Sequence, residues 1–251
     1  MKNIPIRKNI PIRLAMLLAA SLTCSVAGAH GAHTTDVYLT TAQVDGAMAI
    51  LAPPSAPGSA EDLADRAATD RAFAQRSTAD FNAALQEEKF DAFAFAPVVG
   101  PGFEADKLPH VAALFKEAEE ETKQAVDTSK NHWKRLRPCP PASACARDPE
   151  EAKKKSYGYP SGHSSRATVD AILLAQLFPQ DADALMQHAR DIGWRRVVKG
   201  VHTLQDIYAG RVFGQALATA MLASPVMQHD LAAAAEELRA AGLVKPTPAT
   251  P

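Results

Sequence analysis

The chain of 251 residues is 47% hydrophobic and 22% charged, and its formal net charge is −1. This supply of apolar residues suffices for a substantial core, which excludes a chain that is disordered throughout. The balance of acidic and basic residues excludes a generally basic surface, so we expect no nucleic acid as a specific partner.

The first 29 residues have the pattern of a secretory signal peptide. Four basic residues come first, an apolar run follows over 14–26, and an A-x-A cleavage site ends at Ala29. The apolar run is short for a bilayer span, which makes a retained anchor the weaker alternative, and Cys24 lacks the preceding small residue of a lipidation signal. Cleavage would leave 23 basic and 28 acidic residues, a net charge of −5, in a periplasmic or secreted protein.

Residues 30–59 are first polar and then rich in Pro, Gly and Ser, which predicts an N-terminal extension and loop. Beyond them, apolar residues recur at helical spacing and no strand alternation persists. The predicted helices cover 61–90 (one or two helices), 109–130, 164–178, 181–201, 204–222 and 228–241. We therefore predict one all-α helical-bundle domain over 60–243, without internal repeats, and a disordered tail over 244–251.

The stretch 138–160 has the features of an irregular surface loop close to a binding site. It contains several prolines and the basic cluster at 153–155. Cys139 and Cys145 are the two cysteines that removal of the signal peptide would leave. In an oxidising compartment such a pair predicts a disulfide, with two unpaired thiols as the alternative.

A first basic segment, residues 130–138, lies where a predicted helix gives way to a proline. Arg137 offers a planar guanidinium that can hold two phosphate oxygens, and Lys130 adds a compact positive charge. Taken alone, the segment is more typical of a basic helix end that faces solvent.

A second segment, residues 159–165, directly precedes an apolar helix. Gly162 lets a ligand approach the backbone closely, and Ser161 and the first N–H groups of the helix can donate hydrogen bonds to an anion. His163, whose ordinary pKa is near neutrality, is suited to proton transfer at that position. An ordinary helix cap is the alternative interpretation.

A third segment, residues 194–206, contains Arg196, His202 and Asp206. Four residues apart, His202 and Asp206 would share a helix face, so the carboxylate can accept a hydrogen bond from one imidazole nitrogen. The lone pair of the other nitrogen is then free to attack an electrophile. A structural hydrogen bond is the alternative for such a pair.

Together the three segments resemble the three-part signature of the type-2 phosphatidic-acid-phosphatase superfamily. Six residues separate Lys130 from Arg137, Pro-Ser-Gly-His stands complete at 160–163, Arg196 precedes His202 by six and Asp206 follows it by four. The superfamily includes bacterial class A non-specific acid phosphatases, lipid phosphatases and vanadium haloperoxidases. The resemblance covers residues 130–211 by motif and implies an all-α fold that needs no metal or other cofactor.

The resemblance also implies an activity and a set of roles. The activity is hydrolysis of small-molecule phosphate monoesters, over a broad substrate range, through a phosphohistidine. Catalysis would fall to His202 as nucleophile, Asp206 as the residue that orients it, and His163 as acid and then base. The phosphoryl oxygens would be held by Lys130, Arg137, Ser161, Gly162 and Arg196.

One position departs from the superfamily pattern, which usually has serine directly before the third-segment arginine. Arg195 stands there instead. A hydroxyl contact to phosphate is then lost, or replaced by a guanidinium that either helps to neutralise the transition state or crowds the site. Arg135, beside the first segment, could face solvent and is assigned no role.

Other functions stay open for the same residues. Phosphotransfer to an alcohol and vanadate-dependent haloperoxidase chemistry would use the same oxyanion site, whereas an integral lipid phosphatase would need apolar spans of ~20 residues that the mature chain lacks. From a different class, a periplasmic phosphate-binding or metal-binding protein would give a use to His30 and His33, although two terminal histidines make a weak metal site. A homodimer is compatible with the Ala-rich helix faces.

Overall fold

The computed structural model describes residues 38–150 and 156–244, and within these ranges it is all-α, without a β-strand, as predicted. The predicted signal peptide and all of the predicted tail except Val244 lie outside the described residues, as do His30 and His33. The α-helices are α1 (Thr41–Ala49), α2 (Ala60–Gln75), α3 (Thr78–Gln86), α4 (Ala96–Val99), α5 (Pro109–Trp133), α6 (Ala144–Arg147), α8 (Gly162–Leu177), α9 (Ala182–Val198), α10 (Leu204–Leu222) and α11 (Pro225–Ala240). Short 3-10 turns are η1 (Glu87–Lys89), η2 (Ala92–Phe95) and η3 (Pro179–Asp181).

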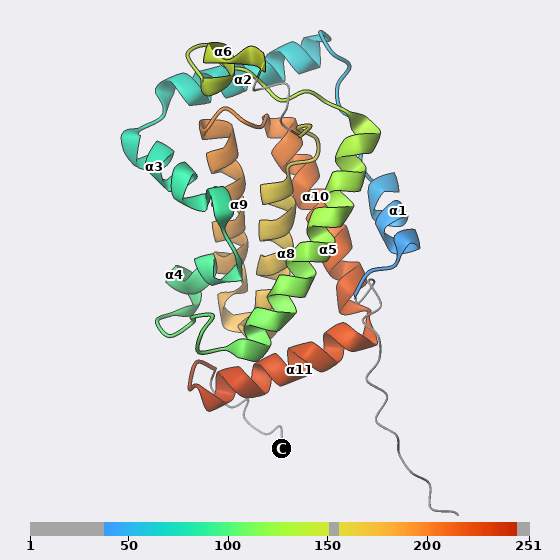
Figure 1. The fold of residues 1–251 in the computed structure, drawn as a ribbon, viewed down its shortest axis with the longest axis vertical. Helices are drawn as coiled ribbons and strands as arrows, with labels where there is room; N and C mark the ends of the chain where they lie inside the picture. The colour runs from blue at the N-terminus through green and yellow to red at the C-terminus, as the bar shows by residue number, and fades with distance from the viewer. Residues whose placement is uncertain (1–37, 151–155, 245–251) are drawn as a thin grey trace, which may run out of the picture. The chain divides into compact units, whose positions relative to one another are not determined.

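Helix α8 is the centre of the bundle. It packs against α10, α9 and α5, and Figure 1 shows it between α9 and α10 with α5 in front. Ten of its residues are buried and they occur on every side of the helix, which is typical of a helix enclosed by others. Helix α5 is amphipathic instead, with buried residues such as Val111, Leu114 and Ala118 at helical spacing. Helix α11 crosses the end of α5 that lies away from α2.

Within the predicted N-terminal extension and loop of residues 30–59, the structure has a helix that was not predicted, α1 at 41–49. The helix begins with a capping box, in which the Thr40 side chain accepts from Gln43 N and the Gln43 side chain accepts from Thr40 N. Before it, the N–H groups of Tyr38 and Leu39 donate to the two carboxylate oxygens of Glu121 at 2.8 and 2.7 Å. These bonds satisfy the carboxylate of Glu121, which is buried.

Two smaller differences concern helix ends and the loop at 138–160. Helix α9 stops at Val198, before the predicted end at 201, because Gly200 has a φ of +75° that closes the turn. The loop contains one turn of helix, α6, whose N-cap Ser143 accepts from Ala146 N. The other predicted helices are confirmed, with ends that differ by a few residues.

Two glycines let α10 approach α8 at backbone contact. A Cβ atom at Gly214 would lie 2.5 Å from the carbonyl oxygen of Ser165, and one at Gly210 would lie 2.7 Å from that of Ser161. Such distances are too short for any side chain, so only glycine fits. Because α8 and α10 both begin at the candidate site, this contact fixes the relative position of their first turns.

We expect Gly214→Ala to destabilise the fold by about 1–3 kcal/mol, since the added methyl group forces α10 away from α8. Gly46→Ala is the matched control: Gly46 lies inside α1 with no atom within 4 Å of its Cβ position, and alanine should stabilise by up to ~1 kcal/mol. Urea denaturation measures both changes. Equal effects of the two substitutions would contradict the close packing.

Candidate active site

The structure brings the three predicted segments together where α5 and α9 end and α8 and α10 begin. All of the predicted site residues lie at these helix ends or directly beside them: Lys130, Arg137, Ser161, Gly162, His163, Arg196, His202 and Asp206. Arg137 Nη1 lies 3.0 Å from His202 Nε2, and Lys130 Nζ lies 3.7 Å from the Cβ position of Gly162. Residues from four helices therefore form one cluster.

The end of α5 places Arg137 in this cluster. Lys134 adopts a left-handed conformation, with φ 51°, which terminates the helix. In the segment that follows, Arg135 is buried, Leu136 is 69% exposed and Arg137 points inward again. Arg137 Nε donates to Ser156 O at 2.7 Å, and Nη1 donates to Val201 O at 2.9 Å. These bonds hold the guanidinium against His202.

The start of α8 supplies hydrogen-bond donors. Ser161 is the N-cap, and its hydroxyl accepts from Ser164 N at 3.4 Å, so the alternative interpretation as a helix cap is also true. The Ser161 hydroxyl accepts one hydrogen bond and keeps its own hydrogen for a second partner. The amide of Gly162 lies in the first turn of α8, where N–H groups have no acceptor within the helix. The cap and the anion site are therefore compatible.

The pairing of His202 with Asp206 was predicted for the wrong geometric reason. His202 lies outside α10, and Asp206 is the third residue of a capping box in which its side chain accepts from Thr203 N at 3.0 Å. The same oxygen, Oδ2, lies 3.3 Å from His202 Nδ1. A proton on Nδ1 then leaves the Nε2 lone pair directed at Arg137.

The three cations of the cluster are held together at an electrostatic cost. Burial lowers the pKa of Lys130 to about 8 and that of Arg196 to about 10, and in each case the charge of Arg137 lowers it further. Burial lowers the pKa of Arg137 as well. Lys130 makes no ion pair with any residue of the described ranges. A bound anion would relieve this repulsion, so the cluster is suited to phosphate.

Both histidines are neutral in the ligand-free site. Burial and then the charge of Arg137 lower the pKa of His202 to about 3, against the opposing effect of Asp206. Burial and then the charge of Arg196 lower the pKa of His163 to about 2. His163 Nε2 lies 3.2 Å from Glu87 O in η1. Neutral His202 is the form that a nucleophile requires, whereas His163 must gain a proton before it can act as an acid.

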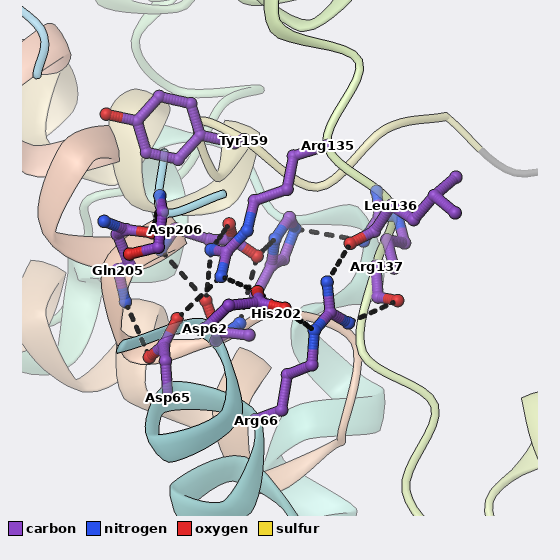
Figure 2. A network of polar contacts seen from close by, with 12 residues as sticks. Asp62, Asp65, Arg66, Arg135, Leu136, Arg137, Tyr159, His202, Gln205 and Asp206 are labelled. Atoms are coloured by element: carbon purple, nitrogen blue, oxygen red, sulfur yellow. Dashed lines mark hydrogen bonds and ion pairs between the residues drawn. The ribbon is translucent and has the colours of Figure 1, made fainter. Parts of the chain in front are cut away.

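Arg135, which the sequence left without a role, lies at the centre of a buried ion network (Figure 2). Its side chain is only 3% exposed, and Nη1 donates to Asp206 Oδ1 and Thr203 Oγ1, both at 2.8 Å. Nη2 donates to Asp62 at 2.9 Å and to Asp65 at 3.0 Å, both on α2. Burial would raise the pKa of Asp206, but His202 and Arg135 together lower it. The sequence around Arg135 could not predict these partners, because they lie about seventy positions away along the chain.

Arg195, where serine was expected, forms an ion pair with Glu87. Burial raises the pKa of Glu87, and the charge of Arg195 opposes that shift. Glu87 also contributes the backbone oxygen near His163, so Arg195 ties the η1 turn to α9 beside the histidine. Its guanidinium is engaged by a carboxylate in the ligand-free protein.

Cys139 and Cys145 form the predicted disulfide, with their Cα atoms 5.4 Å apart. Within residues 38–150 and 156–244, no three His, Cys, Asp or Glu side chains are grouped as a metal site would require. None of the helices in the described ranges combines the length and apolar character that crossing a lipid bilayer requires.

We expect Arg135→Ala to destabilise the fold by about 3–5 kcal/mol, because it removes the buried cation that pairs with Asp206, Asp62 and Asp65. Arg66→Ala is the matched control. Arg66 bonds the same Asp62 at 3.0 Å, but its side chain is 28% exposed, so its loss should cost about 1 kcal/mol or less. Chemical denaturation of both variants is the measurement, and similar losses would show that the network does not depend on Arg135.

Comparison with known proteins finds relatives for the part of the chain that carries the site. Residues 122–230 match the model of the PAP2 superfamily. An acid phosphatase of Zymomonas mobilis subsp. mobilis is 30% identical over 156 residues, which are 61% of this chain and 59% of that protein. A non-specific acid phosphatase of Providencia stuartii is 25% identical over 207 residues, 80% of this chain and 84% of that protein. The chain thus spans about three fifths of the length of the Zymomonas relative.

Among solved structures, a similar chain is that of the first transmembrane PAP2 type phosphatidylglycerolphosphate phosphatase from Bacillus subtilis. It has a TM-score of 0.46 and 18% sequence identity, over 72% of this chain and 90% of its own.

Proposed function

Because residues 122–230 match the model of the PAP2 superfamily, we propose that the chain is an acid phosphatase that hydrolyses phosphate monoesters through a phosphohistidine. The observation that carries the proposal is the position of His202: its Nε2 points into a cluster of three cations while its Nδ1 faces Asp206. A phosphoryl group held by the cations would meet the lone pair of the nucleophile.

In the first step, the substrate phosphate takes the place of His202 Nε2 as the partner of Arg137. The Nε2 lone pair forms the bond to phosphorus, and the P–O bond to the alcohol breaks with its electrons going to oxygen. A proton from His163 neutralises the leaving alcohol. Asp206, fixed by Arg135 and Thr203, stabilises the positive charge that develops on the imidazole.

In the second step, water attacks the phosphohistidine. His163, now neutral, accepts a proton from the water as it attacks, and the N–P bond breaks with its electrons returning to Nε2. The product phosphate leaves and Arg137 returns to His202. Side chains alone supply the charge that this cycle needs, so we propose that it proceeds without a metal ion.

The site also limits how His163 is protonated. With its pKa at about 2 in the ligand-free site, His163 brings no proton to the encounter. A phosphate monoester has a second pKa of about 6, so below that pH the substrate monoanion carries one. The negative charge of bound phosphate also offsets the charge of Arg196, which raises the proton affinity of His163.

The proposed location is the periplasm or the medium outside the cell. The signal-peptide pattern of residues 1–29 supports it, and so does the disulfide, because such bonds persist in oxidising compartments.

His202→Ala should abolish turnover of p-nitrophenyl phosphate, with a loss of about 10⁴-fold or more, because the nucleophile is gone. Wild-type activity should persist in EDTA, and quenching in alkali during turnover should trap phosphate on His202, as detected by mass spectrometry, because the N–P bond of phosphohistidine survives alkali and hydrolyses in acid. A protein that only binds phosphate would show no turnover in either form and would keep most of its affinity in the variant. Thr219→Ala, on the exposed side of α10, is the matched control and should be fully active.

The dependence of kcat/KM on pH should be bell-shaped, with its maximum below neutrality. On the acid side the rate falls as His202 gains a proton and loses its lone pair, around the pKa of about 3. On the alkaline side it falls as the substrate loses its proton, near pH ~6, and the leaving alcohol is no longer protonated. A rate that rises steadily to alkaline pH would contradict the roles given to the two histidines.

A further inference from the structure

A cavity of about 650 Å³ lies directly beside the candidate site. One wall is the loop closed by the disulfide, a second is formed by Phe73, Arg76 and Phe81 around the junction of α2 and α3, and a third by residues 199–201. This volume is within the range of cavities that hold small molecules, and it exceeds what inorganic phosphate needs.

The cavity and the cation cluster share Arg137 and Val201. Arg137 lines the cavity, and its Nη1 lies 3.0 Å from His202 Nε2. Val201, the residue directly before His202, also lines the cavity, and its backbone oxygen accepts from Arg137 Nη1. A phosphoryl group bound to Arg137 would therefore have the cavity next to it.

The chemistry of the walls is aromatic and cationic. The guanidinium carbon of Arg76 lies 3.7 Å from the ring centroid of Phe73 and 4.8 Å from that of Phe81, so the three side chains form one stacked group. Tyr157 and the exposed side chain of Leu136 line the same space. Aromatic rings and a guanidinium plane are surfaces on which another aromatic ring stacks.

The far wall is held in place by covalent and hydrogen bonds. The disulfide closes the loop from Cys139 to Cys145, and Arg147 Nη1 donates to Ala142 O at 2.7 Å across it. On the other side, the Cβ position of Gly200 lies 2.8 Å from Phe73 and 2.9 Å from Pro140, so loop and helix α2 are packed against this glycine. The walls of the cavity are therefore held by bonds and contacts within the protein.

We infer that this cavity is the subsite for the leaving group and that it selects phosphate monoesters whose alcohol carries an aromatic ring. The inference rests on the proposed function, because it takes the phosphoryl group to be held by Arg137 beside His202. The ring lies against the Phe73, Arg76 and Phe81 group, and the ester oxygen lies at the boundary between cavity and cluster. Small aliphatic esters fill the cation site but leave the cavity to water.

The test compares 2-phenylethyl phosphate with ethyl phosphate. Both are esters of primary alcohols, so their chemical reactivity is similar and the ratio of kcat/KM reports the contact made by the ring. We expect the wild-type protein to prefer the phenylethyl ester by about tenfold or more, from burial of the ring. Calorimetric binding of 3-phenylpropyl phosphonate and propyl phosphonate, which are non-hydrolysable isosteres, should show the same preference without turnover.

Phe81→Ala should remove most of the preference while leaving the ethyl ester unchanged. Leu85→Ala, on the same helix and outside the cavity, is the matched control and should keep the full preference. Tyr157→Ala, in the loop, tests the cavity if Phe81→Ala does not fold, and it should reduce the preference several-fold. Circular dichroism establishes folding for each variant.

The outcomes separate the two proposals. Turnover of both esters without a preference, or an equal loss on both in Phe81→Ala, overturns the aromatic subsite and leaves the phosphatase intact. Turnover of neither ester, with a phosphonate preference that depends on Phe81, overturns the phosphatase and retains the subsite. The absence of both turnover and preference overturns both proposals.

Discussion

Asp206 is the buried carboxylate on which the arrangement of the site depends. Arg135, Thr203 N and His202 all direct hydrogen-bonding groups at it, and its own backbone oxygen accepts from Ser161 N at 2.9 Å. Its charge opposes the lowering of the pKa of Lys130 and of Arg137, two cations that repel one another. The carboxylate charge orients the imidazole and partly offsets that repulsion, and the backbone oxygen of the same residue anchors the start of α8.

The close contact of α8 with α10 also fixes the arrangement of the site. Each helix begins at the site, and the two glycines of α10 bring the backbones together so that Ser161 and Asp206 are bonded through their main chains. Geometry set by backbone atoms varies less than geometry set by long side chains. Ser161 and Asp206, which adjoin the proposed phosphate donors and the proposed nucleophile, are therefore positioned by this backbone contact.

Sequence patterns predicted the all-α fold and the convergence of the three segments, because proline and glycine mark helix ends and the site residues lie at those ends. They did not predict α1, whose contacts with α10 and whose preceding link to Glu121 are long-range. They also placed His202 on a helix face, although a capping box makes the contact with Asp206. The role of Arg135 could not be predicted from the sequence, because only tertiary packing brings its acidic partners on α2 close to it.

Two of these partners, Asp62 and Asp65, lie on α2, outside the segment 122–230 that matches the superfamily model. Cut out by itself, that segment would leave Arg135 with Asp206 but without its two carboxylate partners on α2. The part of the chain that carries the family pattern is thus not an autonomous unit, and the N-terminal helices are as much a component of the site as the residues that face the ligand.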